Sequence, residues 1–241
     1  MVFLFPLIFI IFFTLLKWKH PSMYRILALK EDGIVENLTS IFYFISCFIS
    51  FSIALKYSTN SQKLYSVPYF ALACCFFFIA MEEISWGQRI FGIQTPEYLM
   101  EDNYQGEMNI HNLKFFPLHA LYIIVGLYGG LSRVFLPKST VNKYKPIVNY
   151  FIPDYHLSLY FLIIGLLYLY YEYLSPFIVL LFGDQFGWGE GNFIHGKDQE
   201  PAEFLLSIGF FLFIVTNQYR QLYDKNSFPW KTKRQIEQLR I

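Results

Sequence analysis

The chain has 241 residues, of which 55% are apolar, 21% aromatic and only 15% charged. Soluble domains carry about 25% charged residues, so this composition is typical of a protein with several membrane-spanning segments. A net charge of +1 argues against a nucleic-acid surface. The three cysteines all fall inside apolar runs, which excludes an extramembrane disulfide framework and a CxxC metal or redox motif.

Apolar segments recur along the whole chain. They are Val2–Leu16, Leu38–Leu55, Val67–Met81, Phe116–Phe135, Leu157–Leu174 (with an alternative end at Phe182) and Ala202–Val215. A helical crossing needs about 20 residues, and shorter ones are tolerated when flanking side chains reach the interface, whereas membrane strands alternate polar with apolar residues. The segments therefore predict an all-α, polytopic integral membrane helix bundle with about six transmembrane helices.

The first segment lacks a basic start and a small-residue cleavage site, so we interpret it as a retained anchor rather than a signal peptide. It is short, and the sixth segment is only slightly longer with its flanks, so the alternative is five full crossings with one of these two segments partly embedded. We predict one transmembrane domain over residues 1–219 and a short basic cytoplasmic tail over residues 220–241.

The distribution of Lys and Arg predicts an orientation. With six crossings and a cytoplasmic N-terminus, the cytoplasmic segments 56–66, 133–156 and 216–241 hold twelve of the nineteen Lys and Arg residues. This agrees with the positive-inside rule and predicts a multi-pass membrane protein with both termini in the cytoplasm. The basic loop 17–30 is an exception, because the same model places it outside.

The same orientation places most acidic residues together on the outer face. Fifteen of the eighteen Asp and Glu residues fall there, and the exceptions are Asp154, Asp224 and Glu237. The acid-rich stretches 31–36, 82–107 and 184–203 then meet in one compartment. One interpretation is that outer loops are simply polar; the other is a composite site.

Adjacent carboxylates end the third apolar segment, in the motif MEEISWGQR. Glu82 and Glu83 repel each other unless a cation or a proton is shared between them, so both are candidate catalytic residues. On a continuing helix, Glu82, Ser85, Trp86 and Arg89 would share one side. Trp86, Gln88 and Arg89 are candidate substrate-binding residues. The alternative is an interfacial helix end with solvated acids and a tryptophan anchor.

The motif GEMNIHNL follows before the next apolar segment. Glu107 and His111 are four residues apart, which on a helix points a carboxylate and an imidazole the same way. His111 is a third candidate catalytic residue. Asn109 and Asn112 are candidates for substrate binding, or they cap a helix.

A divalent metal is a candidate cofactor of this face. Carboxylates with an imidazole suit Zn, Mn or Fe, and carboxylates alone suit Ca. The candidate ligands are Glu36, Glu83, Glu107, His111 and Glu203. Capping of helix starts is the alternative role for Glu36 and Glu203. His195, in a glycine-rich loop, is a further candidate ligand.

The stretches EEISWGQRIFG and GEMNIHNL, with EDGIVENLTS upstream, resemble a signature of uncharacterised polytopic membrane proteins of bacteria. About a third of the chain supports the resemblance. It implies a multi-pass protein of the bacterial plasma (inner) membrane and carries no known activity.

We therefore predict an integral membrane protein with a carboxylate and histidine site at the outer interface. The leading hypothesis is a metal-assisted hydrolase or transferase that acts on a lipid or lipid-linked substrate. The alternative is a non-catalytic subunit that binds protein partners or a second copy of the chain. A channel or transporter ranks lowest, because the centres of the apolar segments contain no Lys, Arg, Asp or Glu.

Overall fold

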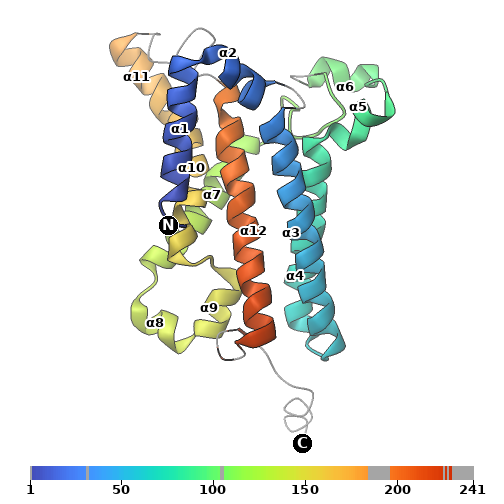
Figure 1. The fold of residues 1–241 in the computed structure, drawn as a ribbon, viewed down its shortest axis with the longest axis vertical. Helices are drawn as coiled ribbons and strands as arrows, with labels where there is room; N and C mark the ends of the chain where they lie inside the picture. Colours follow the sequence, from blue (N-terminus) through green and yellow to red (C-terminus); the bar gives the residue numbers. More distant parts are fainter. Residues whose placement is uncertain are drawn as a thin grey trace, which may run out of the picture.

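The computed structural model describes residues 2–30, 33–103, 106–183, 196–224, 226, 228 and 229. In this part of the chain every regular secondary-structure element is a helix (Figure 1). Five helical stretches are long and apolar enough to cross a membrane: Pro21–Thr59, Lys63–Glu83, Leu118–Phe135, Lys145–Phe182 and Glu200–Tyr223. The predicted all-α membrane helix bundle is thereby confirmed.

The helix α1 (Phe5–Lys19) corresponds to the first apolar segment and has only 15 residues. A full crossing takes about 20 residues. In Figure 1, α1 runs beside part of α12 (Glu200–Tyr223) and ends near α2 (Pro21–Tyr24). It packs through Phe9, whose ring centre lies 5.7 Å from that of Phe204.

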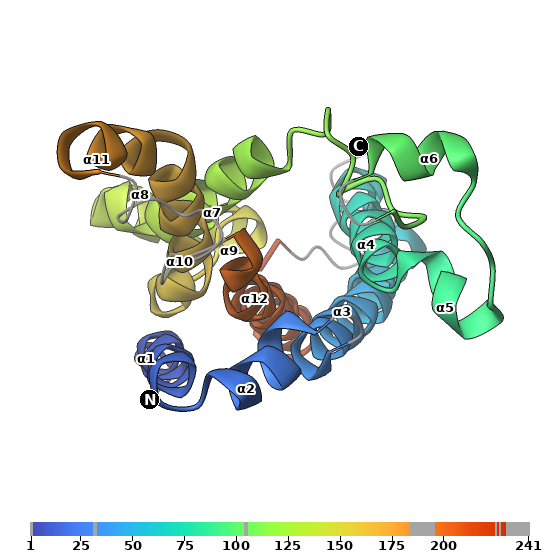
Figure 2. The same ribbon diagram turned by 90° about the horizontal axis from the view of Figure 1, so that it is seen from above.

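The bundle is built from two helix pairs joined by α12. The first pair is α3 (Ile34–Thr59) with α4 (Lys63–Glu83), and the second is α7 (Leu118–Phe135) with α10 (Ser158–Leu169). The helix α12 packs against α3 and α10, and Figure 2 shows the pairs on either side of it. The fifth apolar segment continues through a π-helical turn (Tyr170–Leu174) into α11 (Ser175–Phe182), which confirms the longer of its two predicted ends.

Glycines allow α7 and α10 to approach closely. A Cβ atom added to Gly126 would lie 2.5 Å from the Cα atom of Gly165, far inside a normal contact. Small residues at a crossing let two backbones approach, which is how membrane helices associate where the hydrophobic effect is weak.

The two ends of the bundle differ in charge. One end, here called the acidic end, holds Glu36, residues 82–103 and 106–117, and Glu203; it includes α5 (Gln88–Phe91) and α6 (Glu97–Asp102) (Figure 1). The opposite end, here called the basic end, holds the α3–α4 connection, α8 (Lys138–Lys143) and α9 (Lys145–Phe151). The predicted grouping of acid-rich stretches at one end is therefore confirmed for the described residues.

The basic loop 17–30 also lies at the acidic end, and part of its charge is neutralised there. The ammonium group of Lys17 pairs with the carboxylate of Asp198 at 2.5 Å, and the hydroxyl of Tyr24 donates to the same carboxylate at 2.7 Å. This ion pair ties the end of α1 to the short turn (Gly196–Gln199) that precedes α12.

Candidate functional site

The end of α4 is an abrupt reversal of the backbone. The helix stops at Glu83, and Ser85, Trp86 and Gly87 then adopt φ values of 46°, 56° and 74°. This left-handed conformation costs about 1–2 kcal/mol for each residue that carries a Cβ atom. The prediction that Ser85 and Trp86 extend the α4 helix is therefore wrong, because tertiary contacts impose a turn.

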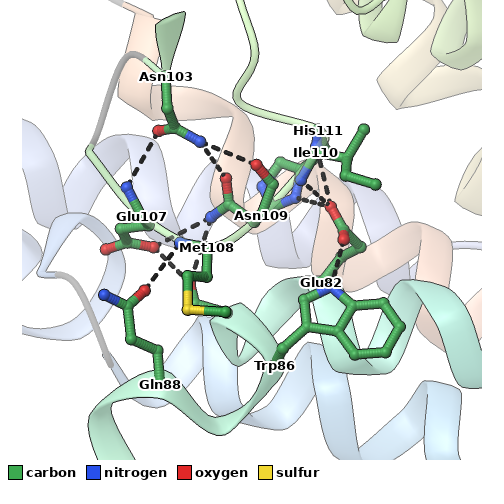
Figure 3. Close-up of polar contacts among 10 residues, drawn as sticks. Glu82, Trp86, Gln88, Asn103, Glu107, Met108, Asn109, Ile110 and His111 are labelled. Carbon is green, nitrogen blue, oxygen red and sulfur yellow. Dashed lines mark hydrogen bonds and ion pairs between the residues drawn. The ribbon is translucent and has the colours of Figure 1, made fainter. Parts of the chain in front are cut away.

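Glu82 holds this turn against the following loop (Figure 3). Its carboxylate is 3% exposed and accepts hydrogen bonds from the Trp86 indole at 2.5 Å and from the backbone amides of Ile110 and His111 at 2.6 and 2.9 Å. The His111 Nδ1 atom lies 3.3 Å from the same carboxylate. Four donors thus surround Glu82, and these contacts orient the His111 imidazole.

Glu107 belongs to a second, neighbouring set of contacts. It is buried and accepts hydrogen bonds from the Ser85 hydroxyl at 2.5 Å and from the Asn109 amide at 3.0 Å. Asn103 in turn donates to the Asn109 backbone and side chain at 2.9 and 2.8 Å. Residues 106–113 are not helical, so the predicted helical alignment of Glu107 with His111 is wrong: their side chains serve different partners.

Gln88 bridges the two halves of the loop. Its amide nitrogen donates to the Thr95 hydroxyl at 2.5 Å, and its oxygen accepts from the Met108 backbone amide at 2.7 Å. Among the candidate substrate-binding residues, Trp86, Gln88 and Asn109 therefore all have structural hydrogen bonds. Asn112 is partly exposed beside His111. The side chain of Arg89, the fifth candidate, lies outside the described part of the chain, as do residues 184–195 with His195.

Carboxylates from three helices converge beside this loop and are called here the carboxylate cluster: Glu83 of α4, Glu203 of α12 and Glu36 of α3. The charge of Glu83 interacts most strongly with that of Glu203, and then with those of Glu200, Glu36 and Glu82. Glu203 is 7% exposed, and Glu83 is partly exposed. Three like charges so placed require neutralisation by protons, cations or hydrogen-bond donors.

Donors to the carboxylate cluster come from the second helix pair. The hydroxyl of Tyr168 donates to the Glu203 carboxylate at 3.4 Å, and Tyr122, whose ring stacks on that of Tyr168, also interacts with Glu203. His111 and His119 both lie within electrostatic range of Glu203. The cluster therefore lies where α4, α7, α10 and α12 meet the loop.

Tyr122 and Tyr168 are the residues that sequence reasoning missed. The Tyr122 and Tyr168 rings stack with their centres 4.8 Å apart. The centre of the His119 ring lies 4.7 Å from that of Tyr168, and His119 also hydrogen-bonds to Glu172. A signal was present: His119 and Tyr122 are three residues apart, and Tyr168 and Glu172 are four apart, so each pair shares a helix face.

The predicted metal ligands are only partly brought together. Glu36, Glu83, Glu203 and His111 lie around one region, whereas Glu107 is bound by Ser85 and Asn109. Within the described residues, no group of three or more His, Cys, Asp or Glu side chains is arranged to hold a metal ion. The metal site remains a prediction.

Comparisons with known proteins add no assignment to this geometry. No protein-family model, no curated protein and no solved structure matches the chain.

Proposed function

We propose that the protein is an integral membrane enzyme that acts on a lipid or lipid-linked substrate at the acidic end, with Glu83 as its general acid–base group. The observation that carries the proposal is the electrostatic interaction of Glu83 with Glu203 of a different helix, and of Glu203 with the His111 imidazole. The proposal places this end on the outer face of a bacterial inner membrane and the basic end in the cytoplasm, as the positive-inside rule favours.

The energetic cost of the carboxylate cluster supports a chemical role. Burial of like charges is unfavourable, and a purely structural contact between α4 and α12 is made more cheaply by apolar side chains. Ionisable groups at membrane depth typically mark a site of proton transfer or ligand binding. Glu83 is half-buried, whereas the more buried Glu203 accepts a hydrogen bond from the Tyr168 hydroxyl.

The roles of Glu82 and His111 follow from their contacts. Glu82 is surrounded by four donors, so we assign it a positioning role in place of the catalytic role first considered. By holding Nδ1 of His111, it leaves the other ring nitrogen to exchange a proton with substrate or to bind a divalent metal. A metal held by this imidazole and Glu83 would polarise a carbonyl or phosphoryl oxygen.

The test is product formation in vesicles. The purified protein is reconstituted into phosphatidylethanolamine and phosphatidylglycerol, with lipid extract of the source membrane added, and lipids are analysed by mass spectrometry with and without Zn²⁺ or Mn²⁺. We expect new lipid products, with a rate at least about 100-fold lower for Glu83→Gln, because a general acid–base group contributes about 10²–10⁴-fold. The exposed Glu97→Gln variant is the matched control.

Unchanged lipids under all metal conditions, or equal rates for Glu83→Gln and Glu97→Gln, would contradict the proposal. Elemental mass spectrometry of the purified protein, beside the His111→Ala variant, separates a metal-assisted reaction from a metal-free one.

A second candidate function is that of a subunit that docks partners at the acidic end. Ile90, Phe91 and Tyr98 on α5 and α6 are 73%, 75% and 72% exposed, outside the spanning helices. An apolar surface of this kind is typical of a docking site. Stoichiometric proteins that co-purify with the native chain, and are lost in Phe91→Ser, would favour this function.

A further inference from the structure

An apolar groove of about 360 Å³ lies between α4 and α7, away from the carboxylate cluster. Leu72 lines it from α4, Ile124 and Gly129 from α7, and Phe213 from α12, with Phe151 and Pro153 at its basic end. The ribbons of α4 and α7 stand apart in Figure 2.

The groove presents carbon atoms even where tyrosines line it. The Tyr69 hydroxyl donates to the Tyr150 backbone oxygen at 3.2 Å and accepts from Asn217 at 2.7 Å. The Tyr150 hydroxyl donates to the Tyr65 backbone, and the Tyr128 hydroxyl donates to the Phe151 backbone at 3.0 Å. The hydroxyls are already engaged by protein, so the surface left for an occupant suits a hydrocarbon chain.

Charged side chains lie next to the basic end of this groove. Arg133 lies four residues after Gly129 on the same side of α7, and Asp154 directly follows Pro153. The Asp154 carboxylate pairs with Arg133 at 3.4 Å and also with Arg220. Two guanidinium groups thus share one carboxylate, which leaves one positive charge in excess within this trio.

Arg133 also has an unsatisfied hydrogen-bonding group. Its Nη2 atom donates to the Asn149 side chain at 3.1 Å, but its Nη1 atom is buried and has no hydrogen-bond partner among the described residues. A buried donor without an acceptor is unfavourable, and an anionic oxygen is its strongest acceptor. The side chain as a whole remains 13% exposed.

We propose that this groove binds one acyl chain of an anionic phospholipid whose phosphate pairs with Arg133. Basic pockets between transmembrane helices are suited to anionic head groups. Bilayer lipid is as apolar as the groove, so the acyl chain alone gives little preference over bulk lipid, and selectivity must come from the head group. This site is separate from the proposed enzyme site and does not depend on it.

The test is lipid selectivity of the purified full chain, measured by native mass spectrometry with phosphatidylglycerol and phosphatidylcholine of identical acyl chains. We expect wild type to prefer phosphatidylglycerol, and Arg133→Gln to lose about five-fold of that preference, the factor that corresponds to about 1 kcal/mol per basic side chain. Asp154 keeps its pairing with Arg220 in this variant. Lys138→Gln removes the same charge from α8, outside the groove, and should retain the preference.

Blocking the groove tests the acyl-chain half of the proposal. Ile124 and Val134 are 63% and 60% exposed on α7, and only Ile124 lines the groove. Ile124→Trp should reduce binding of both lipids, whereas Val134→Trp should bind as wild type does. Added phosphatidylglycerol should also raise the melting temperature of wild type more than that of Arg133→Gln. Equal selectivity in wild type and Arg133→Gln, or an equal loss in Lys138→Gln, would overturn the proposal.

Discussion

Replacement of Glu82 by glutamine tests whether this carboxylate holds the loop at the acidic end. The side chain is 3% exposed and lies against the Trp86 indole, the Ile110 amide and two donors of His111. Glutamine has the same shape but replaces one acceptor oxygen with a donor. Whichever way the amide turns, at least one donor of the protein then faces an N–H group.

The magnitude follows from the four contacts. A hydrogen bond to a charged group contributes about 1.5–3 kcal/mol, and a neutral one about 1 kcal/mol. Glu82→Gln loses the hydrogen bond from Trp86, which contributes about 1.5 kcal/mol because Trp86 is 37% exposed. The substitution also weakens the hydrogen bonds from the Ile110 and His111 backbone amides, because their acceptor is no longer charged. We expect a loss of about 3–4 kcal/mol in the free energy of unfolding, a large part of the usual 5–15 kcal/mol.

A double-mutant cycle isolates the bond between Glu82 and Trp86. The free energy of unfolding is measured by SDS titration in micelles and followed by circular dichroism, because tryptophan fluorescence changes with the variant. Trp86→Phe should cost less in the Glu82→Gln background than in wild type, with a coupling energy of about 1–2 kcal/mol. Trp18, which is 65% exposed on α1, provides the control Trp18→Phe, which should show no coupling. Additivity of Glu82→Gln and Trp86→Phe within about 0.5 kcal/mol would refute the reasoning.

Other contacts give further predictions. Ser85→Ala should lower the free energy of unfolding by about 1–3 kcal/mol, because the hydrogen bond to Glu107 is lost. Ser85→Gly should lower it by about 1 kcal/mol less, because glycine adopts the φ of 46° without strain. Equal losses for the two variants in SDS titrations would contradict this. Gly126→Leu should separate α7 from α10 and lower the melting temperature, since even a Cβ atom would meet Gly165 at 2.5 Å; an unchanged melting temperature in a thermal scan would show that the crossing is not tight. Asp154→Asn should cost about 3–5 kcal/mol, because its two arginine partners, 13% and 14% exposed, lose their shared counter-charge; removal of one arginine as well should restore part of the loss in the same titration.

The sequence alone predicted the helices and their grouping by end. Runs of apolar residues long enough to cross a bilayer leave few options, because a backbone in lipid must satisfy its own hydrogen bonds as a helix. The number of connections then determines which loops share an end, so Glu36, Glu82 and Glu203 could be placed together before any contact was known. The short first segment was also recognisable, and α1 has 15 residues.

The local course of the chain after Glu83 was not predictable from spacing. Residues Ser85 to Gly87 leave the helix, and the resulting turn places the Ser85 hydroxyl against the distant Glu107 carboxylate. Such left-handed residues have no strong signal in a single sequence, because serine and tryptophan rarely adopt that conformation. The same contacts separated Glu107 from His111, whose spacing alone indicated a shared face.

What only the tertiary structure decided is which polar residues meet. Tyr168 and Glu203 are far apart in the chain, and their contact exists because α10 and α12 pack together. The apolar groove likewise depends on the separation of α4 from α7, which no local pattern encodes. Composition and periodicity determined that this chain is a membrane helix bundle with an acidic end, because solvation by lipid acts on every residue. Which side chains contact each other in the site depends on how the helices pack, and that packing joins residues distant in sequence.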